Sequence, residues 1–169
     1  MIANNILLIG FMGVGKGRVA RELASMTGSF AVDTDDLIES FTNTEINKIF
    51  KNQGEIYFRT LEQRVAKWLE HQVTRTVIST GGGFFAVENL NNIGTVVFLK
   101  AGFAAILQEM QDHPRAKKKI KKRPLIRDFE KAKALFDRRQ PLYLAKADIV
   151  VNVVGKGSAE IAREILAGL

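Results

Sequence analysis

Five short apolar runs alternate along the chain with longer segments in which apolar residues recur every three or four positions. This alternation is the sequence signature of an α/β protein built on a parallel sheet. The apolar runs predict five strands, over residues 6–9, 30–33, 77–80, 95–99 and 148–152.

The segments between these runs predict helices. Val19, Leu23 and Met26 recur at helical spacing, so we expect an amphipathic helix over 16–27 that ends at Gly28. The second and third strands are separated by about 40 residues, which is too long for a plain crossover. We expect a side lobe of helices there, broken at Gly54. The other predicted helices are 36–41, 44–52, 55–72, 102–111, 129–145 and 158–166.

The composition is that of a globular protein. The chain has 169 residues, of which 46% are hydrophobic and 25% charged, so we expect one domain over 1–169 with a packed core. No apolar run is long enough to span a membrane, and no export signal precedes the first strand. The sequence has no cysteine, which fits the cytoplasm. We therefore expect a cytoplasmic monomer that has no membrane partner.

The positive charge is concentrated in one stretch. The net charge is +7, and residues 115–127 contain 8 basic residues and no acidic one. The rest of the chain has 17 basic and 18 acidic residues. No aromatic residue that could stack on bases interrupts the basic stretch. We therefore expect no nucleic-acid partner.

The segment GFMGVGKGRVA, residues 10–20, follows the first strand and resembles a phosphate-binding loop of the form G-x-x-x-x-G-K-[ST]. Such a loop turns its backbone N–H groups and the start of the next helix toward an anion, and its lysine reaches the outer phosphates. The alternative is a glycine-rich turn between a strand and a helix. The candidate nucleotide-binding residues are Gly10, Met12, Gly13, Val14, Gly15, Lys16, Gly17 and Arg18.

One position departs from this loop pattern. Gly17 stands where the pattern has a serine or threonine, whose hydroxyl would bind the magnesium ion of a nucleotide. The departure weakens the prediction of metal binding rather than that of phosphate binding. It leaves open whether the chain is a competent enzyme.

Two aspartates follow the second predicted strand, in the segment VDTDD. Ligands of open α/β sheets lie beyond the carboxyl ends of strands, so Asp33 and Asp35 should face the phosphate loop. There one carboxylate can hold magnesium through water while the other accepts a proton from an attacking hydroxyl. The alternative is that Asp35 or Asp36 only caps the next helix.

Later segments add further candidates. In YFRTLE, Arg59 and Glu62 share a helix face, and taken alone they suggest a surface ion pair. In STGGGF, three glycines let the backbone approach a bound molecule closely, although a plain loop is the alternative. The segments RPLI and RRQPLY offer guanidinium groups suited to binding oxyanions.

In this order, GFMGVGK, DTD, FRTLE, TGGG, RPL and RQPLY resemble the shikimate kinases, a P-loop family similar to the nucleoside monophosphate kinases. The resemblance extends from residue 6 to about residue 151. It implies a three-layer P-loop fold, in which helices flank a five-stranded parallel sheet. It also implies a small helical substrate lobe over about 34–62 and a mobile lid over about 112–126.

The resemblance implies transfer of the γ-phosphoryl group of ATP to the 3-hydroxyl of shikimate, with Mg²⁺, in aromatic amino-acid biosynthesis. Lys16 and the loop would then hold the phosphates, and Asp33 would orient the magnesium through water. Asp35 would bind the shikimate hydroxyls and act as the base. The other implied site residues are Arg59 and Arg139 on the shikimate carboxylate, Gly81, Gly82 and Gly83 beside the ring, and Arg123, which would reach from the lid to the transferred phosphoryl group.

Family members often have an arginine near the end of the helix before the lid that contacts the adenine. In this chain Glu109 and Met110 stand at about that position, and Arg115 or a lysine could take the place of the missing arginine. Two other functions stay open at this point. One is another small-molecule kinase, such as a gluconate kinase, and the other is an inactive nucleotide-binding or regulatory module, suggested by Gly17.

Overall fold

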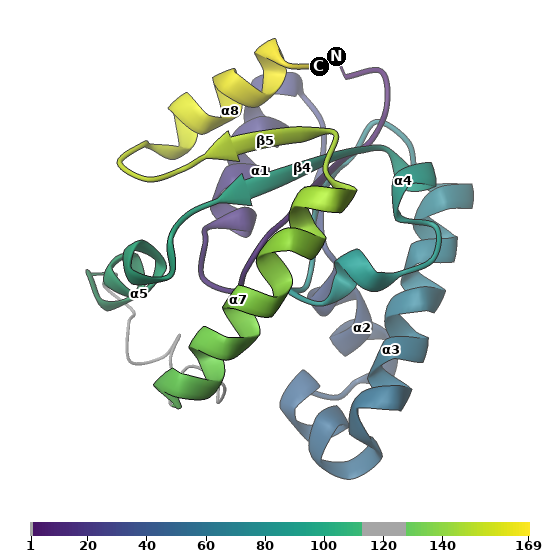
Figure 1. Ribbon diagram of the computed structural model, residues 1–169. Coiled ribbons are helices and arrows are strands. Elements are labelled where there is room, and N and C mark those ends of the chain that lie inside the picture. Colours follow the sequence, from purple (N-terminus) through teal and green to yellow (C-terminus); the bar gives the residue numbers. More distant parts are fainter. Residues whose placement is uncertain (1, 113–127) are drawn as a thin grey trace.

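Five parallel strands form the centre of the computed structural model, which describes residues 2–112 and 128–169 (Figure 1). The strand order in the sheet is β2-β3-β1-β4-β5, so the first strand lies in the middle. The predicted parallel sheet is confirmed, with every strand end within one residue of its prediction. The strands are β1 Ile6–Ile9, β2 Ala31–Asp33, β3 Val77–Ser79, β4 Thr95–Lys100 and β5 Ile149–Asn152.

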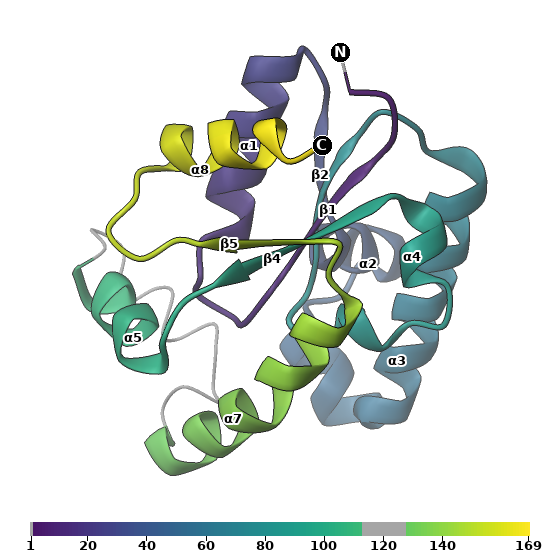
Figure 2. The same cartoon turned by 45° about the horizontal axis from the view of Figure 1, so that its top comes forward.

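Helices cover both faces of the sheet, which gives the three layers that were predicted (Figure 2). One face carries α1 Lys16–Thr27 and α8 Ser158–Ala167, and the other carries α3 Ile46–Gln72, α4 Leu90–Ile93 and α7 Phe129–Lys146. The remaining helices are α2 Thr34–Thr42, the 3-10 turn η1 Phe84–Ala86 and α5 Phe103–Asp112. The sequence did not predict α4 and η1, because elements this short show no periodicity.

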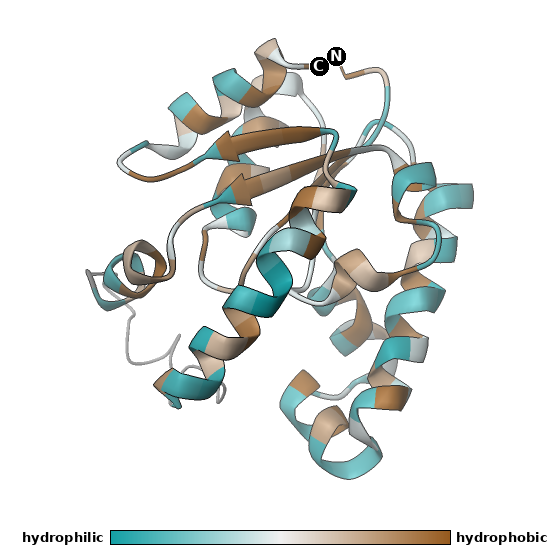
Figure 3. Cartoon of the chain, viewed as in Figure 1, coloured by the Kyte–Doolittle hydropathy of each residue, from teal (hydrophilic) through white to brown (hydrophobic). Residues whose placement is uncertain are grey.

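The three central strands, β3, β1 and β4, are apolar because both of their faces are covered (Figure 3). All residues of β1 and β3 are buried, as are the central residues of β4. One residue of α1 differs from expectation. Met26 is 40% exposed, and the buried face of α1 consists of Lys16, Val19, Ala20, Leu23 and Ala24.

The segment between β2 and β3 forms a lobe with a small core of its own. Ile38, Ile49, Phe58 and Leu61 form this cluster between α2 and α3. The predicted break at Gly54 is present, since its φ of 82° and ψ of 175° interrupt the helical backbone of α3. This separate cluster shows that the segment folds as a lobe, whereas a role of residues 34–62 in binding the substrate stays a prediction.

Helix α5 follows β4 and ends at Asp112, where the range predicted for the lid begins. The lid was placed over about 112–126, and of this range only Asp112 belongs to the described residues, as the last residue of α5. The lid prediction and Arg123 therefore lie outside the part of the chain that the structure describes.

None of the described helices has the length and apolar character needed to cross a membrane.

Candidate active site

Two cavities lie at the carboxyl ends of the central strands and share part of their walls. The first, of about 560 Å³, lies between the phosphate loop and the ends of β2 and β3, and the second, of about 570 Å³, lies between the lobe and α7. Both are lined by Met12, Asp35, Gly81 and Gly82. Groups bound in the two cavities would therefore meet beside Asp35.

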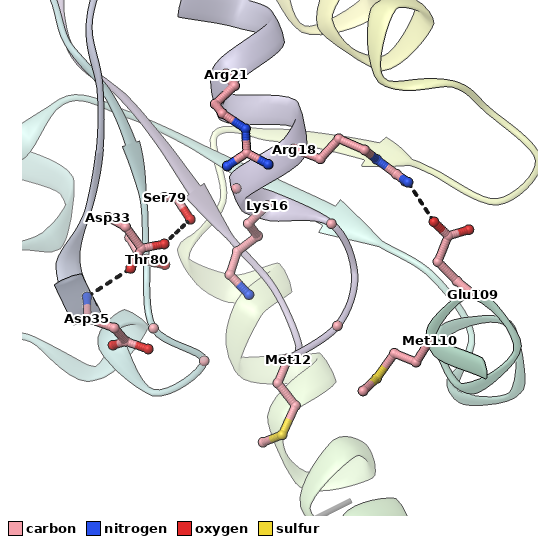
Figure 4. A pocket seen from close by; sticks show the side chains of 15 residues that line it. Met12, Lys16, Arg18, Arg21, Asp33, Asp35, Ser79, Thr80, Glu109 and Met110 are labelled. Carbon is pink, nitrogen blue, oxygen red and sulfur yellow. Dashed lines mark hydrogen bonds and ion pairs between the residues drawn. The ribbon is translucent and has the colours of Figure 1, made fainter. Parts of the chain in front are cut away.

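The predicted phosphate loop forms the wall of the first cavity (Figure 4). Gly13 has a φ of 92°, and a Cβ at this position would lie only 2.5 Å from the sulfur of Met110. Gly15, at φ 100°, precedes the first residue of α1. The Lys16 ammonium donates to the carbonyl oxygens of Gly10 at 2.7 Å and Phe11 at 3.1 Å. The lysine amine therefore lies inside the phosphate loop, close to where a bound phosphate would lie.

Asp33 links the start of α2 to the end of β3. Its Oδ1 accepts a hydrogen bond from the Asp35 N–H at 2.9 Å, and its Oδ2 accepts one from the Ser79 hydroxyl at 2.7 Å (Figure 4). Asp33 is thus the residue that caps the helix. The alternative that Asp35 or Asp36 caps it is wrong, and α2 starts two residues earlier than predicted because the cap lies at residue 33.

Asp35 is placed where the two cavities join. Its Oδ1 is buried and has no hydrogen-bond partner in the described part of the chain. Burial raises the pKa of Asp35 to about 7, and the nearby carboxylates of Asp33 and Glu62 add to the effect. A carboxyl group with such a pKa can exchange a proton near neutral pH.

Glu62 and Arg59 form an ion pair at the wall of the second cavity. The Glu62 side chain is only 2% exposed, so the alternative of a surface ion pair is wrong. Arg59 also binds Glu55, with 2.8 Å between Nη2 and Oε1. Burial raises the pKa of Glu62 although Arg59 opposes it, and Glu62 Oε1 has no hydrogen-bond partner among the described residues. Sequence patterns alone could not show that this glutamate is buried.

The glycine segment after β3 joins the two sides of the second cavity. The carbonyl oxygen of Gly82 accepts hydrogen bonds from Arg139 Nη1 at 3.1 Å and from the Tyr143 hydroxyl at 2.6 Å. A side chain at Gly83 would collide with the guanidinium of Arg59. The structure thus brings Arg59 of α3 and Arg139 of α7 to one cavity, as predicted, on either side of the glycines.

Glu109 and Met110, which stand about where the family often has an arginine, both contact the phosphate-loop region. Glu109 forms an ion pair with Arg18 of α1, with 2.7 Å between Oε1 and Nη1 (Figure 4). Met110 is buried beside Gly13. Neither side chain offers the cation that the resemblance would place here. Arg18 brings a guanidinium to the same place from the other helix, whereas Arg115 is not among the described residues.

The site offers oxygen atoms rather than a complete set of metal ligands. Over residues 2–112 and 128–169, no three His, Cys, Asp or Glu side chains come together in a way that could hold a metal ion. Asp33 and Ser79 contribute a carboxylate and a hydroxyl beside the phosphate loop. Oxygen donors of this kind, few in number, suit Mg²⁺, which keeps several waters and binds substrate phosphates. The residues therefore fit a hydrated magnesium ion that arrives with a nucleotide.

A family model, a protein of known function and a solved structure that resemble this chain are all described as shikimate kinases. A family model described as shikimate kinase matches residues 12–169. The chain is 39% identical to the shikimate kinase of Helicobacter hepaticus over 163 residues, which covers 96% of this chain and 93% of that protein. A structure of shikimate kinase from Acinetobacter baumannii in complex with shikimate is 33% identical and superposes with a TM-score of 0.86, covering 97% of this chain and 91% of the other.

A gluconokinase structure from Sinorhizobium meliloti is also similar. It superposes with a TM-score of 0.61 over 98% of this chain and 91% of the other, at 16% identity. Such a low identity establishes a common fold and nothing more.

Proposed function

Because the chain belongs to the shikimate kinase family, we propose that it transfers the γ-phosphoryl group of ATP to the 3-hydroxyl of shikimate. One observation carries the assignment of residues to this reaction. The phosphate-loop cavity and the cavity lined by Arg59 and Arg139 share Asp35 as a wall residue, so a donor in one and an acceptor in the other can approach each other beside this carboxylate.

On the donor side, Lys16 and the loop backbone bind the phosphates of ATP. The lysine amine already lies inside the loop, bound to carbonyl oxygens that hold it in place. Asp33, fixed by the Ser79 hydroxyl and the Asp35 N–H, orients the hydrated Mg²⁺. When bound, this ion supplies positive charge that offsets the negative charge of the phosphate oxygens.

On the acceptor side, Arg59 and Arg139 bind the carboxylate of shikimate. Two guanidinium groups that converge on one cavity suit a planar carboxylate, because each can donate two parallel hydrogen bonds. Gly81, Gly82 and Gly83 let the ring approach the backbone, since a side chain at Gly81 would meet the Asp35 carboxylate at 2.5 Å. The position of the glycines thus keeps Asp35 within reach of the acceptor.

The transfer itself needs a base at the junction of the cavities. Asp35 accepts the proton of the 3-hydroxyl, whose oxygen forms a bond to the γ-phosphorus while the bond from that phosphorus to the β–γ bridging oxygen breaks and ADP leaves. Asp35 lines both cavities, so its carboxylate can receive this proton from an acceptor bound in the second.

The same proposal covers the setting of the enzyme. We place the reaction in the cytoplasm, within the biosynthesis of aromatic amino acids, and expect a monomer whose ligands are small molecules. The absence of nucleic-acid and membrane partners stays a prediction of the sequence.

Identification of the phosphorylated product tests the proposal. The protein is incubated with ATP, Mg²⁺ and either shikimate or gluconate, and the products are analysed by mass spectrometry. We expect a phosphoryl group on shikimate and none on gluconate, because the chain belongs to the shikimate kinase family and Arg59 and Arg139 line the acceptor cavity. Phosphorylated gluconate, with shikimate unchanged, would assign the chain to another small-molecule kinase activity.

The raised pKa of Asp35 predicts how the reaction depends on pH. The carboxylate is the active form of a base, and its pKa of about 7 means that protonation removes this form as the pH falls through 7. We expect kcat/KM for shikimate to fall about tenfold per pH unit below 7 and to level off above it. Steady-state rates measured between pH 5.5 and 8.5 would show this fall in kcat/KM. A flat profile down to pH 5.5 would mean that Asp35 is not the base.

A further inference from the structure

The surroundings of Gly17 show what lies where the missing hydroxyl would be. A Cβ built on Gly17 would have two described side-chain atoms within 4 Å, Arg21 Nη1 at 3.6 Å and the Ser79 hydroxyl oxygen at 3.8 Å. Both distances are ordinary van der Waals contacts, so a serine would fit at position 17. Its hydroxyl, one bond beyond the Cβ, could reach the space beside the Ser79 hydroxyl.

Of these two neighbours, only Ser79 can replace a hydroxyl in contact with a cation. A guanidinium group has donors and no acceptor, whereas a hydroxyl oxygen has two lone pairs. Arg21 would therefore repel a metal ion, while Ser79 can bind one or accept a hydrogen bond from its water.

Ser79 is also held in a fixed position. It is the last residue of β3, is 3% exposed, and donates its hydrogen to Asp33 Oδ2 at 2.7 Å. Its lone pairs are consequently the part of the group that can face a cation. Figure 4 shows Ser79 and Asp33 side by side, across the cavity from the phosphate loop.

We propose that the Ser79 hydroxyl, held by Asp33, takes the place of the hydroxyl that Gly17 lacks and contacts the hydrated magnesium ion of the nucleotide. This inference rests on the proposed function and deepens it. The metal is then held by a strand residue from across the cavity instead of by the phosphate loop. The Asp33 carboxylate has two tasks, to orient the metal's water and to orient Ser79.

Binding of ADP in the absence of shikimate tests this role without turnover. Calorimetry gives the Kd of ADP in EDTA and in excess Mg²⁺, and the ratio of the two measures the metal's contribution. Ser79→Ala should reduce this ratio about tenfold or more in the parent chain, as for other groups that orient a metal's ligands. In the Gly17→Ser background it should change less than about twofold, because either hydroxyl then suffices.

The crossed design separates the possible results. An equal loss in both backgrounds would mean that Ser79 only orients Asp33, and no loss in either would mean that its hydroxyl has no role; both overturn the inference. If the parent does not bind ADP under any condition, the proposed function itself fails. The Kd in EDTA should be the same for all variants, which shows that they are folded.

Two further comparisons test whether the effect of Ser79→Ala arises from the lost hydroxyl or from a general disturbance of the end of β3. Ser79→Thr and Ser79→Val introduce side chains that have the same shape as each other, but only Ser79→Thr keeps a hydroxyl. Only Ser79→Thr should therefore keep the ratio of the parent. Thr80→Val removes the neighbouring buried hydroxyl, which donates to the Leu8 carbonyl oxygen at 2.8 Å, and should leave the ratio unchanged. A loss of equal size in Thr80→Val would contradict the specific role of Ser79.

Discussion

Asp35→Asn is expected to lower kcat for shikimate phosphorylation about 10²- to 10⁴-fold, the range typical for loss of a general base. The amide keeps the size of the side chain but cannot accept the proton of the 3-hydroxyl. The affinity for ATP should hardly change, because Lys16 and the loop bind the phosphates. Steady-state kinetics together with calorimetric titration of ATP would measure both effects.

The same variant should be more stable than the parent at neutral pH. The pKa of Asp35 is raised from the usual 3.8 to about 7 in the folded protein, so its ionised form opposes folding. The gain in the free energy of unfolding should be absent below pH 3.8, grow as the pH rises toward 7, and be complete above it. Denaturation with urea at several pH values would show this gain, which also excludes misfolding as the cause of low activity.

Asp36→Asn is the matched control. Asp36 lies in the same first turn of α2, but its side chain is exposed and lines neither of the two cavities. This variant should keep the parent rate. Equal losses in both variants, or a full rate in Asp35→Asn, would remove Asp35 from the role of base.

Arg139→Ala and Arg59→Ala should each raise the Kd of shikimate about 10- to 150-fold, which corresponds to the roughly 1.5–3 kcal/mol of a charged hydrogen-bonded group. Both residues line the second cavity and not the first, so the affinity for ATP should stay near that of the parent. Calorimetry with each ligand would separate the two effects.

The two arginine variants should differ in stability. Arg59→Ala leaves the buried carboxylate of Glu62 without its ion-pair partner, so it should also lower the free energy of unfolding. Arg139 donates a hydrogen bond to the neutral carbonyl oxygen of Gly82 rather than pairing with a buried carboxylate, so its loss should cost less.

Arg64→Ala is the control for removing an arginine from α3. Arg64 stacks on Phe41, with 4.3 Å between the guanidinium carbon and the ring centre, and lines neither cavity. Its loss should leave shikimate affinity unchanged. Unchanged shikimate affinity in both Arg59→Ala and Arg139→Ala would contradict the carboxylate assignment.

The sequence predicted the sheet well because its central strands, β3, β1 and β4, are covered on both faces and are therefore mostly apolar. Each strand was located to within one residue at either end, and Gly54 was identified as a break. Helix starts were less accurate, because they depend on caps that a pattern does not reveal. Asp33 caps α2 with its own side chain, and this contact moves the start of the helix to Thr34.

The positions of the candidate site residues could be predicted only where they follow from a motif. The phosphate loop and the two aspartates at the end of β2 belong to this group. The burial of Glu62 and the contact between Ser79 and Asp33 depend on how distant segments pack, since residues 33 and 79 meet only in the folded sheet. The proximity of Ser79 to Gly17 likewise became visible only in the structure.

The chain should be a competent shikimate kinase although Gly17 replaces the usual hydroxyl. A coupled assay of ADP release, with and without shikimate and over a range of Mg²⁺ concentrations, decides this question. We expect the parent protein to release ADP only when shikimate is present, with a rate that saturates with Mg²⁺. A parent that is inactive at every Mg²⁺ concentration, beside an active Gly17→Ser variant, would contradict it and identify the chain as an inactive nucleotide-binding module.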